Sequence, residues 1–106
     1  MLVAVIVINR FRLDAARLSE FTERCAPALD LLRTKEGLES LDFAQNLDEP
    51  DLWVLVTRWR NVGSYRRALS GMESKMVVVP FLSLSIDEPS AYDDPENVGE
   101  NPPRVR

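Results

Sequence analysis

The first segment of the chain is apolar on both faces of an extended strand. In residues 2–12 one set of alternate positions reads Leu, Ala, Ile, Ile, and the other reads Val, Val, Val, Asn, Phe. A strand that is apolar on both sides is expected to be buried on both sides. The run is too short for a membrane helix and lacks the basic region and cleavage site of a secretory signal. We therefore interpret it as a strand.

A helix is predicted after this strand. Asp14 is placed to cap its N-terminus, and Gly37 marks the region where it stops. Apolar residues follow at helical spacing and predict one stripe that faces the sheet. These residues are Leu18, Phe21, Cys25, Leu29 and Leu32.

Two further strands are predicted, over residues 38–45 and 52–60. The residues between them, 46–51, have the composition of a hairpin turn. Leu38 falls out of phase with the later apolar positions of its strand, which indicates a β-bulge. Like the first strand, the segment 52–60 has apolar residues on both of its faces.

A second, shorter helix is predicted over residues 62–71, with Asn61 as its cap. Its expected buried stripe consists of Val62, Tyr65, Leu69 and Met72. Residues 73–86 are interpreted as a helical turn followed by a fourth strand near 78–86, because three consecutive valines favour a strand and Pro80 disfavours a helix.

The predicted order of elements is β-α-β-β-α-β, which is the ferredoxin-like pattern of an α+β domain with an antiparallel sheet. Its two helices can cover one face of the sheet. The other face remains apolar, and a patch of that size is rarely left exposed on a monomer. We therefore expect a homodimer that forms sheet against sheet.

Composition narrows the possible chemistry. The chain of 106 residues has no His and one Cys, which argues against a zinc site, a histidine-bound haem and a disulfide framework, so no metal site is expected. The single Cys suggests a reducing, cytoplasmic setting.

Charge separates the chain into two parts. Residues 87–106 hold six acidic and two basic side chains, and the preceding residues 1–86 carry 11 of each sign. We expect a domain over 1–86 followed by an acidic, proline-rich arm or disordered tail over 87–106. This balance predicts neither nucleic acid nor a membrane as a partner.

Over about residues 3–86 the chain resembles the antibiotic biosynthesis monooxygenase superfamily, whose members are dimeric α+β barrels. The resemblance is carried by Val7–Phe11, by Gly37-Leu38, by Leu55–Trp59 and by Ser64–Arg66. It implies a cofactor-independent monooxygenase that oxidises a phenolic, quinol-like or polycyclic aromatic substrate with O2. The haem-degrading branch of the superfamily needs an axial histidine on the second helix. Ala68 lies in that neighbourhood here, so haem degradation is not expected.

The resemblance also implies site residues. Asn9 and Trp59 are the candidate catalytic residues, with Tyr65, Arg58 and Phe43 as candidate contacts to substrate. An oxygenase without a cofactor needs an apolar pocket, a donor for the developing oxyanion and help with deprotonation. Asn9 can donate through its amide, and Trp59 offers an indole N–H and a stacking face.

Some assignments stay open at this stage. Strand alternation puts Arg58 on the opposite side from Trp59, and Phe43 and Trp53 also fit a core or a dimer interface. The general base is either a carboxylate, Asp42 or Glu39, or the acidity of the substrate itself. The alternative to an enzyme is a non-catalytic dimer that binds a small ligand or serves as an accessory protein.

Overall fold

The structure is a computed structural model that describes residues 5–99. Its elements, in chain order, are β1 (Val5–Arg12), α1 (Ala15–Arg33), β2 (Leu38–Gln45), β3 (Leu52–Trp59), α2 (Val62–Ser70), α3 (Met72–Leu82), β4 (Ala91–Tyr92) and α4 (Pro95–Gly99). The expectations for residues 2–4 of the first strand and for residues 100–106 of the tail lie outside the described residues.

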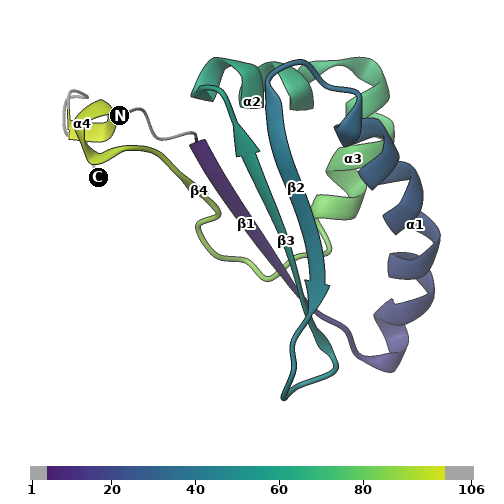
Figure 1. Cartoon of the computed structure of the whole chain (residues 1–106). Helices are drawn as coiled ribbons and strands as arrows, with labels where there is room; N and C mark the ends of the chain where they lie inside the picture. The colour runs from purple at the N-terminus through teal and green to yellow at the C-terminus, as the bar shows by residue number, and fades with distance from the viewer. Residues whose placement is uncertain (1–4, 100–106) are drawn as a thin grey trace.

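The strands form one antiparallel sheet in the order β2-β3-β1-β4. Helices α1, α2 and α3 all lie on one side of this sheet, and no helix of the described residues lies over the centre of the other side (Figure 1). This arrangement confirms the predicted α+β, ferredoxin-like fold.

Alternation along the strands sorts side chains between the two faces as predicted. Val5, Val7, Asn9 and Phe11 of β1 are buried towards the helices, whereas Ile6, Ile8 and Arg10 on the other face are only partly buried. In β3 the positions 53, 55, 57 and 59 lie opposite the helix-facing positions of β1, so they share that face. We call the uncovered side the open face. Its central residues are Ile6, Ile8, Val54, Val56 and Arg58.

The predicted β-bulge is confirmed where β2 begins. The pairing with β3 shifts between Leu38 and Ser40. Gly37, just before it, has φ of 92°, a conformation that favours glycine. A Cβ atom at Gly37 would lie 2.5 Å from Cβ and Oγ of Ser64. The start of β2 and the first turn of α2 are therefore in direct contact.

Helix α1 begins as predicted. The carboxylate of Asp14 accepts a hydrogen bond from the backbone N–H of Arg17 at 3.0 Å. Phe21, Leu29 and Leu32 are buried, but Leu18 is 52% exposed. The expectation that Leu18 joins the buried stripe is wrong, because it lies at the margin of an open groove described below.

The buried face of α2 also differs from the prediction. Val62 and Met72 are exposed, and the buried residues of the helix are Ser64 and Ala68. The helix is capped by Asn61 as predicted, with the Ser64 N–H donating to its side chain. The close packing against Gly37 turns the Ser64 side of the helix inward, because only a small side chain fits there.

The predicted strand near 78–86 is wrong. Residues 72–82 form helix α3, and the fourth strand is the short β4. Ser74, Val78 and Phe81 are buried at helical spacing, so tertiary packing overrides the strand preference of the valines. Pro80 lies in the last turns of α3, where it removes only one helical hydrogen bond.

Residues 83–90 connect α3 to β4 along the edge of β1. The Ile86 N–H donates to the Arg10 carbonyl, and the Ile8 N–H donates to the Ser90 carbonyl, both at 2.7 Å. Arg10 and Glu88 add a two-point ion pair at 2.8 and 2.9 Å. This segment therefore shields an edge strand that would otherwise present free backbone groups.

Candidate functional site

One end of the helix-covered layer is closed. Trp59 is 1% exposed, and its indole N–H donates to the Thr57 hydroxyl at 2.9 Å. The ring of Tyr65 packs against it with centroids 5.9 Å apart. We call Val5, Thr57, Trp59 and Tyr65 the sealed end. The indole N–H that the sequence offered as a donor to substrate is used inside the protein here.

Tyr65 reaches the sealed end from α2. Burial raises the pKa of its phenol, and a hydrogen bond with Ser90 partly offsets that effect. The phenol is therefore protonated at neutral pH, so it can act as a hydrogen-bond donor but not as a ready base.

Asn9 lies on the same face but further along the sheet. It is 8% exposed, and no hydrogen bond joins its amide to the rest of residues 5–99. Asn9 lies opposite Leu55, whereas Trp59 lies opposite Val5. That offset is four residues, or about 13 Å at about 3.3 Å per residue. The two candidate catalytic residues do not meet.

Arg58 and the candidate bases lie elsewhere. Arg58 is exposed on the open face, opposite Ile6, as strand alternation predicts. Asp42 is also exposed and lies beside Val56 on that face, and Glu39 is exposed at the bulge. None of the three faces the interior between sheet and helices.

Phe43 belongs to a cluster of aromatic rings at the opposite end from Trp59. The cluster consists of Phe11, Phe21, Phe43, Trp53 and Phe81. Phe43 and Trp53 stack with centroids 5.3 Å apart and an interplanar angle of 19°. Phe21 of α1 lies 5.9 Å from Phe43 and 6.1 Å from Trp53. Such contacts stabilise beyond the area that they bury.

This cluster forms the wall of an open groove between α1 and strands β2 and β3, which we call the α1 groove. Its volume is about 360 Å³. The groove is lined by Leu13, Leu18, Phe21, Thr22, Cys25, Ala26, Leu29, Asp30, Arg33, Phe43 and Trp53. Of the residues assigned by resemblance, only Phe43 lines it.

Apart from the indole N–H of Trp53, the polar side-chain groups of the α1 groove come from α1. The Arg33 guanidinium lies 3.2 Å from the Asp30 carboxylate, and the Thr22 hydroxyl donates to the Leu18 carbonyl. Burial raises the pKa of the Cys25 thiol, with the charge of Arg33 opposing that effect. The thiol is therefore protonated at neutral pH and acts as a small apolar group.

Sequence reasoning missed Trp53 as a groove residue. It assigned Trp53 to the core or the dimer interface and gave Phe43 that interpretation beside its candidate contact to substrate, because alternation gives the face of a residue but not the cover above it. The available signal was the hairpin, which brings Phe43 and Trp53 to neighbouring positions at the edge of the helix layer.

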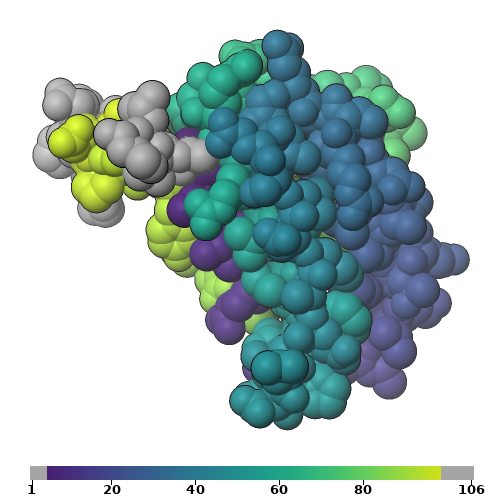
Figure 2. Space-filling model, viewed as in Figure 1, coloured from purple at the N-terminus to yellow at the C-terminus, as the bar shows by residue number. Residues whose placement is uncertain are grey.

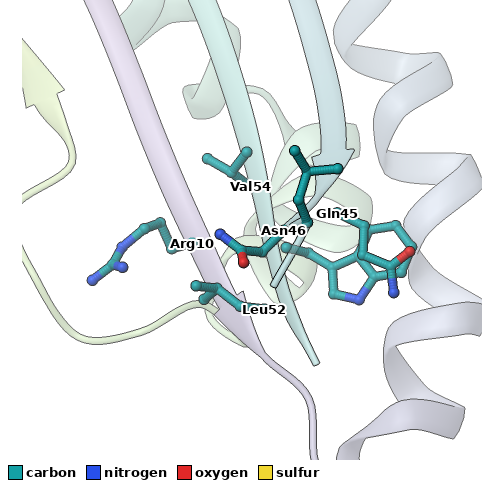
Figure 3. Close-up of a pocket in the computed structure, with 7 residues that line it drawn as sticks. Arg10, Gln45, Asn46, Leu52 and Val54 are labelled. Carbon is teal, nitrogen blue, oxygen red and sulfur yellow. The ribbon is translucent and has the colours of Figure 1, made fainter. Parts of the chain in front are cut away.

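A second pocket lies on the open face at the base of the β2–β3 hairpin. Its volume is about 340 Å³, and it is lined by Arg10, Gln45, Asn46, Leu47, Leu52, Trp53 and Val54. Figure 3 shows Arg10, Asn46, Leu52 and Val54 on the side of the strands away from α1. We call it the hairpin pocket.

Within residues 5–99, no three His, Cys, Asp or Glu side chains are grouped so that they could hold a metal ion. No helix in that range combines the length and apolarity needed to cross a bilayer.

Several solved structures share this fold. A conserved protein from Methanosarcina mazei Go1 is 20% identical, aligned over 87% of this chain and 93% of its own, with a TM-score of 0.71. SnoaB, a cofactor-independent oxygenase from Streptomyces nogalater, is 21% identical over 87% and 93%, with a TM-score of 0.70. Rv0793 from Mycobacterium tuberculosis is 19% identical over 81% and 86%, with a TM-score of 0.65. At these identities the similarity shows a common fold.

No curated protein sequence is significantly similar to the chain. A family model does match, over residues 4–77, and its description is antibiotic biosynthesis monooxygenase. That match covers more than half of the chain. The chain therefore belongs to the antibiotic biosynthesis monooxygenase family.

Proposed function

We propose that the protein is a monooxygenase that oxidises a phenolic, quinol-like or polycyclic aromatic compound with O2 and without a cofactor. The observation that carries this proposal is the α1 groove, an open cavity of about 360 Å³ with aromatic side chains along one wall. Its size lies within the range of small-molecule sites, and its lining of many apolar and few polar groups is typical of them. Membership of the family supports oxygenase chemistry.

The proposed reaction balances without an external reductant. A ring methylene flanked by aromatic rings loses a proton, and the resulting carbanion or phenolate gives one electron to O2. The radical pair combines to a peroxide anion, which takes up the proton released in the first step and becomes a hydroperoxide. Loss of water then leaves a carbonyl, so one oxygen atom enters the product and the other leaves as water. The four electrons that reduce O2 all come from the substrate.

Groove residues supply what this chemistry requires. Phe43 and Trp53 offer flat faces on which an aromatic substrate can stack. Arg33, which lies 3.2 Å from the Asp30 carboxylate at the groove, can donate a hydrogen bond to a phenolate oxygen. With Cys25 protonated, deprotonation depends on the Asp30 carboxylate that lines the groove or on the acidity of the substrate, and the second is one of the alternatives that the sequence left open.

The resemblance proposes a different location, around Asn9 and Trp59. A substrate there would use the Asn9 amide as oxyanion donor and Tyr65 as a polar wall. Asn9→Ala separates the two locations. Loss of turnover with unchanged binding in the groove would favour the Asn9 side.

Oxygen uptake by purified protein with a panel of hydroquinones and anthrones tests the activity. We expect uptake above the uncatalysed rate and its loss in Trp53→Ala. Met76→Ala, on the outer surface of α3, is the matched control and should retain the wild-type rate. Uptake at the uncatalysed rate across the whole panel would contradict the proposal.

A non-catalytic ligand carrier is the second candidate. The hydrogen bond between Trp59 and Thr57 favours it, because this bond gives the tryptophan a structural role in a closed interior. The two candidates differ in one experiment. A carrier would bind an anthrone in the α1 groove, seen as quenching of Trp53 fluorescence in Trp59→Phe protein, without consuming oxygen.

We also propose that the protein is a homodimer through the open face. Ile6, Ile8 and Val56 form an apolar centre that is half-buried and that no helix of residues 5–99 covers. Arg58 and Asp42 are exposed beside this apolar centre. Asp42 lies opposite Val56 in the sheet, and Arg58 lies two residues beyond Val56 along β3. A twofold axis would bring these opposite charges together across the interface twice. Sedimentation should show a dimer for the wild type and a monomer for Val56→Asp, and a monomeric wild type at high concentration would overturn it.

A further inference from the structure

The α1 groove has different chemistry at its two ends. Helix α1 runs alongside β2, and its first turns lie at the hairpin end of the sheet (Figures 1 and 2). At that end the groove is bounded by the rings of Phe21, Phe43 and Trp53. At the other end it is bounded by Asp30 and Arg33, the only charged side chains among the residues of 5–99 that line it. A ligand that fills the groove therefore meets aromatic rings at one end and charges at the other.

A long interval without charge separates the two ends. Phe21 and Asp30 are nine residues apart in α1, which is about 13.5 Å along the helix at a rise of about 1.5 Å per residue. Cys25, Ala26 and Leu29 line the groove in between. Because burial raises the pKa of the Cys25 thiol, this interval carries no charge at neutral pH. Only an elongated ligand can contact both ends.

Asp30 and Arg33 hold each other by one contact and keep further hydrogen-bonding capacity. Nη1 of Arg33 donates to Oδ1 of Asp30 at 3.2 Å. Within residues 5–99, Nε and Nη2 of Arg33 and Oδ2 of Asp30 make no hydrogen bond. The Arg33 and Asp30 side chains are 56% and 76% exposed, so a ligand can reach both. An exposed pair of this kind contributes little to stability, so substitution of either residue should leave the fold intact.

The pair discriminates between ligands by their charge. Its own net charge is zero, and a hydroxyl group that donates to Asp30 and accepts from Arg33 satisfies both partners. A carboxylate accepts from Arg33, but it has no proton to donate and its charge is repelled by Asp30. An ammonium group has the opposite mismatch, with Arg33. The pair therefore favours an uncharged group that both donates and accepts a hydrogen bond.

We infer that the α1 groove binds an elongated ligand, with a fused aromatic ring against Phe43 and Trp53 and an uncharged hydroxyl group at the far end, against Asp30 and Arg33. This inference rests on the proposed function for the location of the substrate. It adds the shape and charge of that substrate, and it makes Asp30 and Arg33 the residues that set specificity. A carboxylate in place of the hydroxyl group weakens binding.

Two matched probes test the specificity. 1-Pyrenebutanol and 1-pyrenebutanoic acid share a fused aromatic ring and a flexible chain and differ in the terminal group. Neither carries a methylene flanked by aromatic rings, so they report binding without turnover. Quenching of Trp53 fluorescence in Trp59→Phe protein measures both affinities, and the diagnostic quantity is their ratio.

We expect Asp30→Asn to shift this ratio about fivefold towards the acid, because Arg33 then binds the carboxylate without a repelling neighbour. Glu23→Gln removes the same charge from an exposed position of α1 outside the groove and should leave the ratio nearly unchanged. Equal shifts in the two variants, or no shift in Asp30→Asn, would overturn the inference. So would the failure of both probes to quench Trp53.

Oxygen uptake separates failure of this inference from failure of the proposed oxygenase. A protein that shows the Asp30-dependent ratio but consumes no oxygen with hydroquinones and anthrones keeps the inference, and the groove then belongs to a ligand carrier. A protein that consumes oxygen but shows no dependence on Asp30 keeps the oxygenase and loses the inference.

Discussion

Trp53 and Trp59 lie on the same face of the same strand, and their surroundings differ. Trp59 lies under α2, is closed off and donates its N–H to Thr57. Trp53 lies at the edge of the helix layer, stacks on Phe43 and lines the α1 groove. The strand therefore sets the direction of a side chain, and the position of the helix above it determines whether a ligand can reach that side chain.

The largest expected effect comes from removing Trp59. Trp59→Ala leaves a cavity in a closed interior and should lower the free energy of unfolding by about 3–5 kcal/mol. Trp53→Ala should cost less, about 1–2 kcal/mol, because its ring is only half-buried. Urea unfolding of both variants measures the difference. If the two variants lost the same free energy of unfolding, the distinction between the sealed end and the α1 groove would be wrong.

The hydrogen bond at the sealed end should matter almost as much. Thr57→Val keeps the shape but leaves the indole N–H without an acceptor, and should destabilise the protein by about 1–3 kcal/mol. Thr57→Ser retains the hydroxyl and is the control. Urea unfolding again reports the result, and a Thr57→Val protein as stable as Thr57→Ser would show that water replaces the bond.

At the α1 groove we expect a substitution to affect the binding of a ligand instead of the stability of the fold. Phe43→Ala removes half of the stacked wall and should weaken binding of an anthrone about tenfold, or about 1.4 kcal/mol. Trp53 fluorescence in Trp59→Phe protein measures the affinity. Asn9→Ala serves as the control for the groove, and a larger loss in Asn9→Ala than in Phe43→Ala would place the ligand on the other side of the layer.

The alkylation rate of Cys25 measures how accessible the α1 groove is. Because burial raises its pKa, alkylation by iodoacetamide at neutral pH should be several-fold slower than for a free thiol and should speed up as the pH rises. A bound anthrone should slow it further. Alkylation that is unaffected by a saturating anthrone would mean that the ligand lies outside the α1 groove.

The smallest expected effect concerns the segment 83–90, which runs along the edge of β1. Arg10 lowers the pKa of Glu88 through their hydrogen bonds, so the pair stabilises the fold above the ordinary pKa of glutamate. That stabilisation is lost as the pH falls through the lowered pKa. The difference in urea midpoint between wild type and Glu88→Gln should therefore be present at neutral pH and vanish in acid. A difference that persists in acid would assign the effect to packing.

The sequence predicted the sheet better than the helices that cover it. Alternation fixed the faces of β1 and β3, and the phase of Leu38 revealed the bulge, because both are local properties of a strand. The strand predicted near 78–86 failed because burial of Val78 and Phe81 against α1 is a tertiary effect. The α1 groove depends on the gap between α1 and β2, and no periodicity reports such a gap.

The candidate site was predicted only in part. Residue types identified aromatic and amide groups with suitable chemistry, and the structure places Trp59 and Tyr65 together. It does not bring Asn9 to them, because Asn9 lies four positions further along the sheet. Phe43 alone among the predicted residues meets an open cavity.

The contact between Gly37 and Ser64 limits where a ligand can enter the molecule. There is no space for even one methyl group between the start of β2 and the first turn of α2, so the rotation of a side chain cannot open a passage there. The backbone itself would have to part. Within residues 5–99, the α1 groove is the opening that the helix side offers to a small molecule, and the contact between Gly37 and Ser64 closes the layer where β2 meets α2.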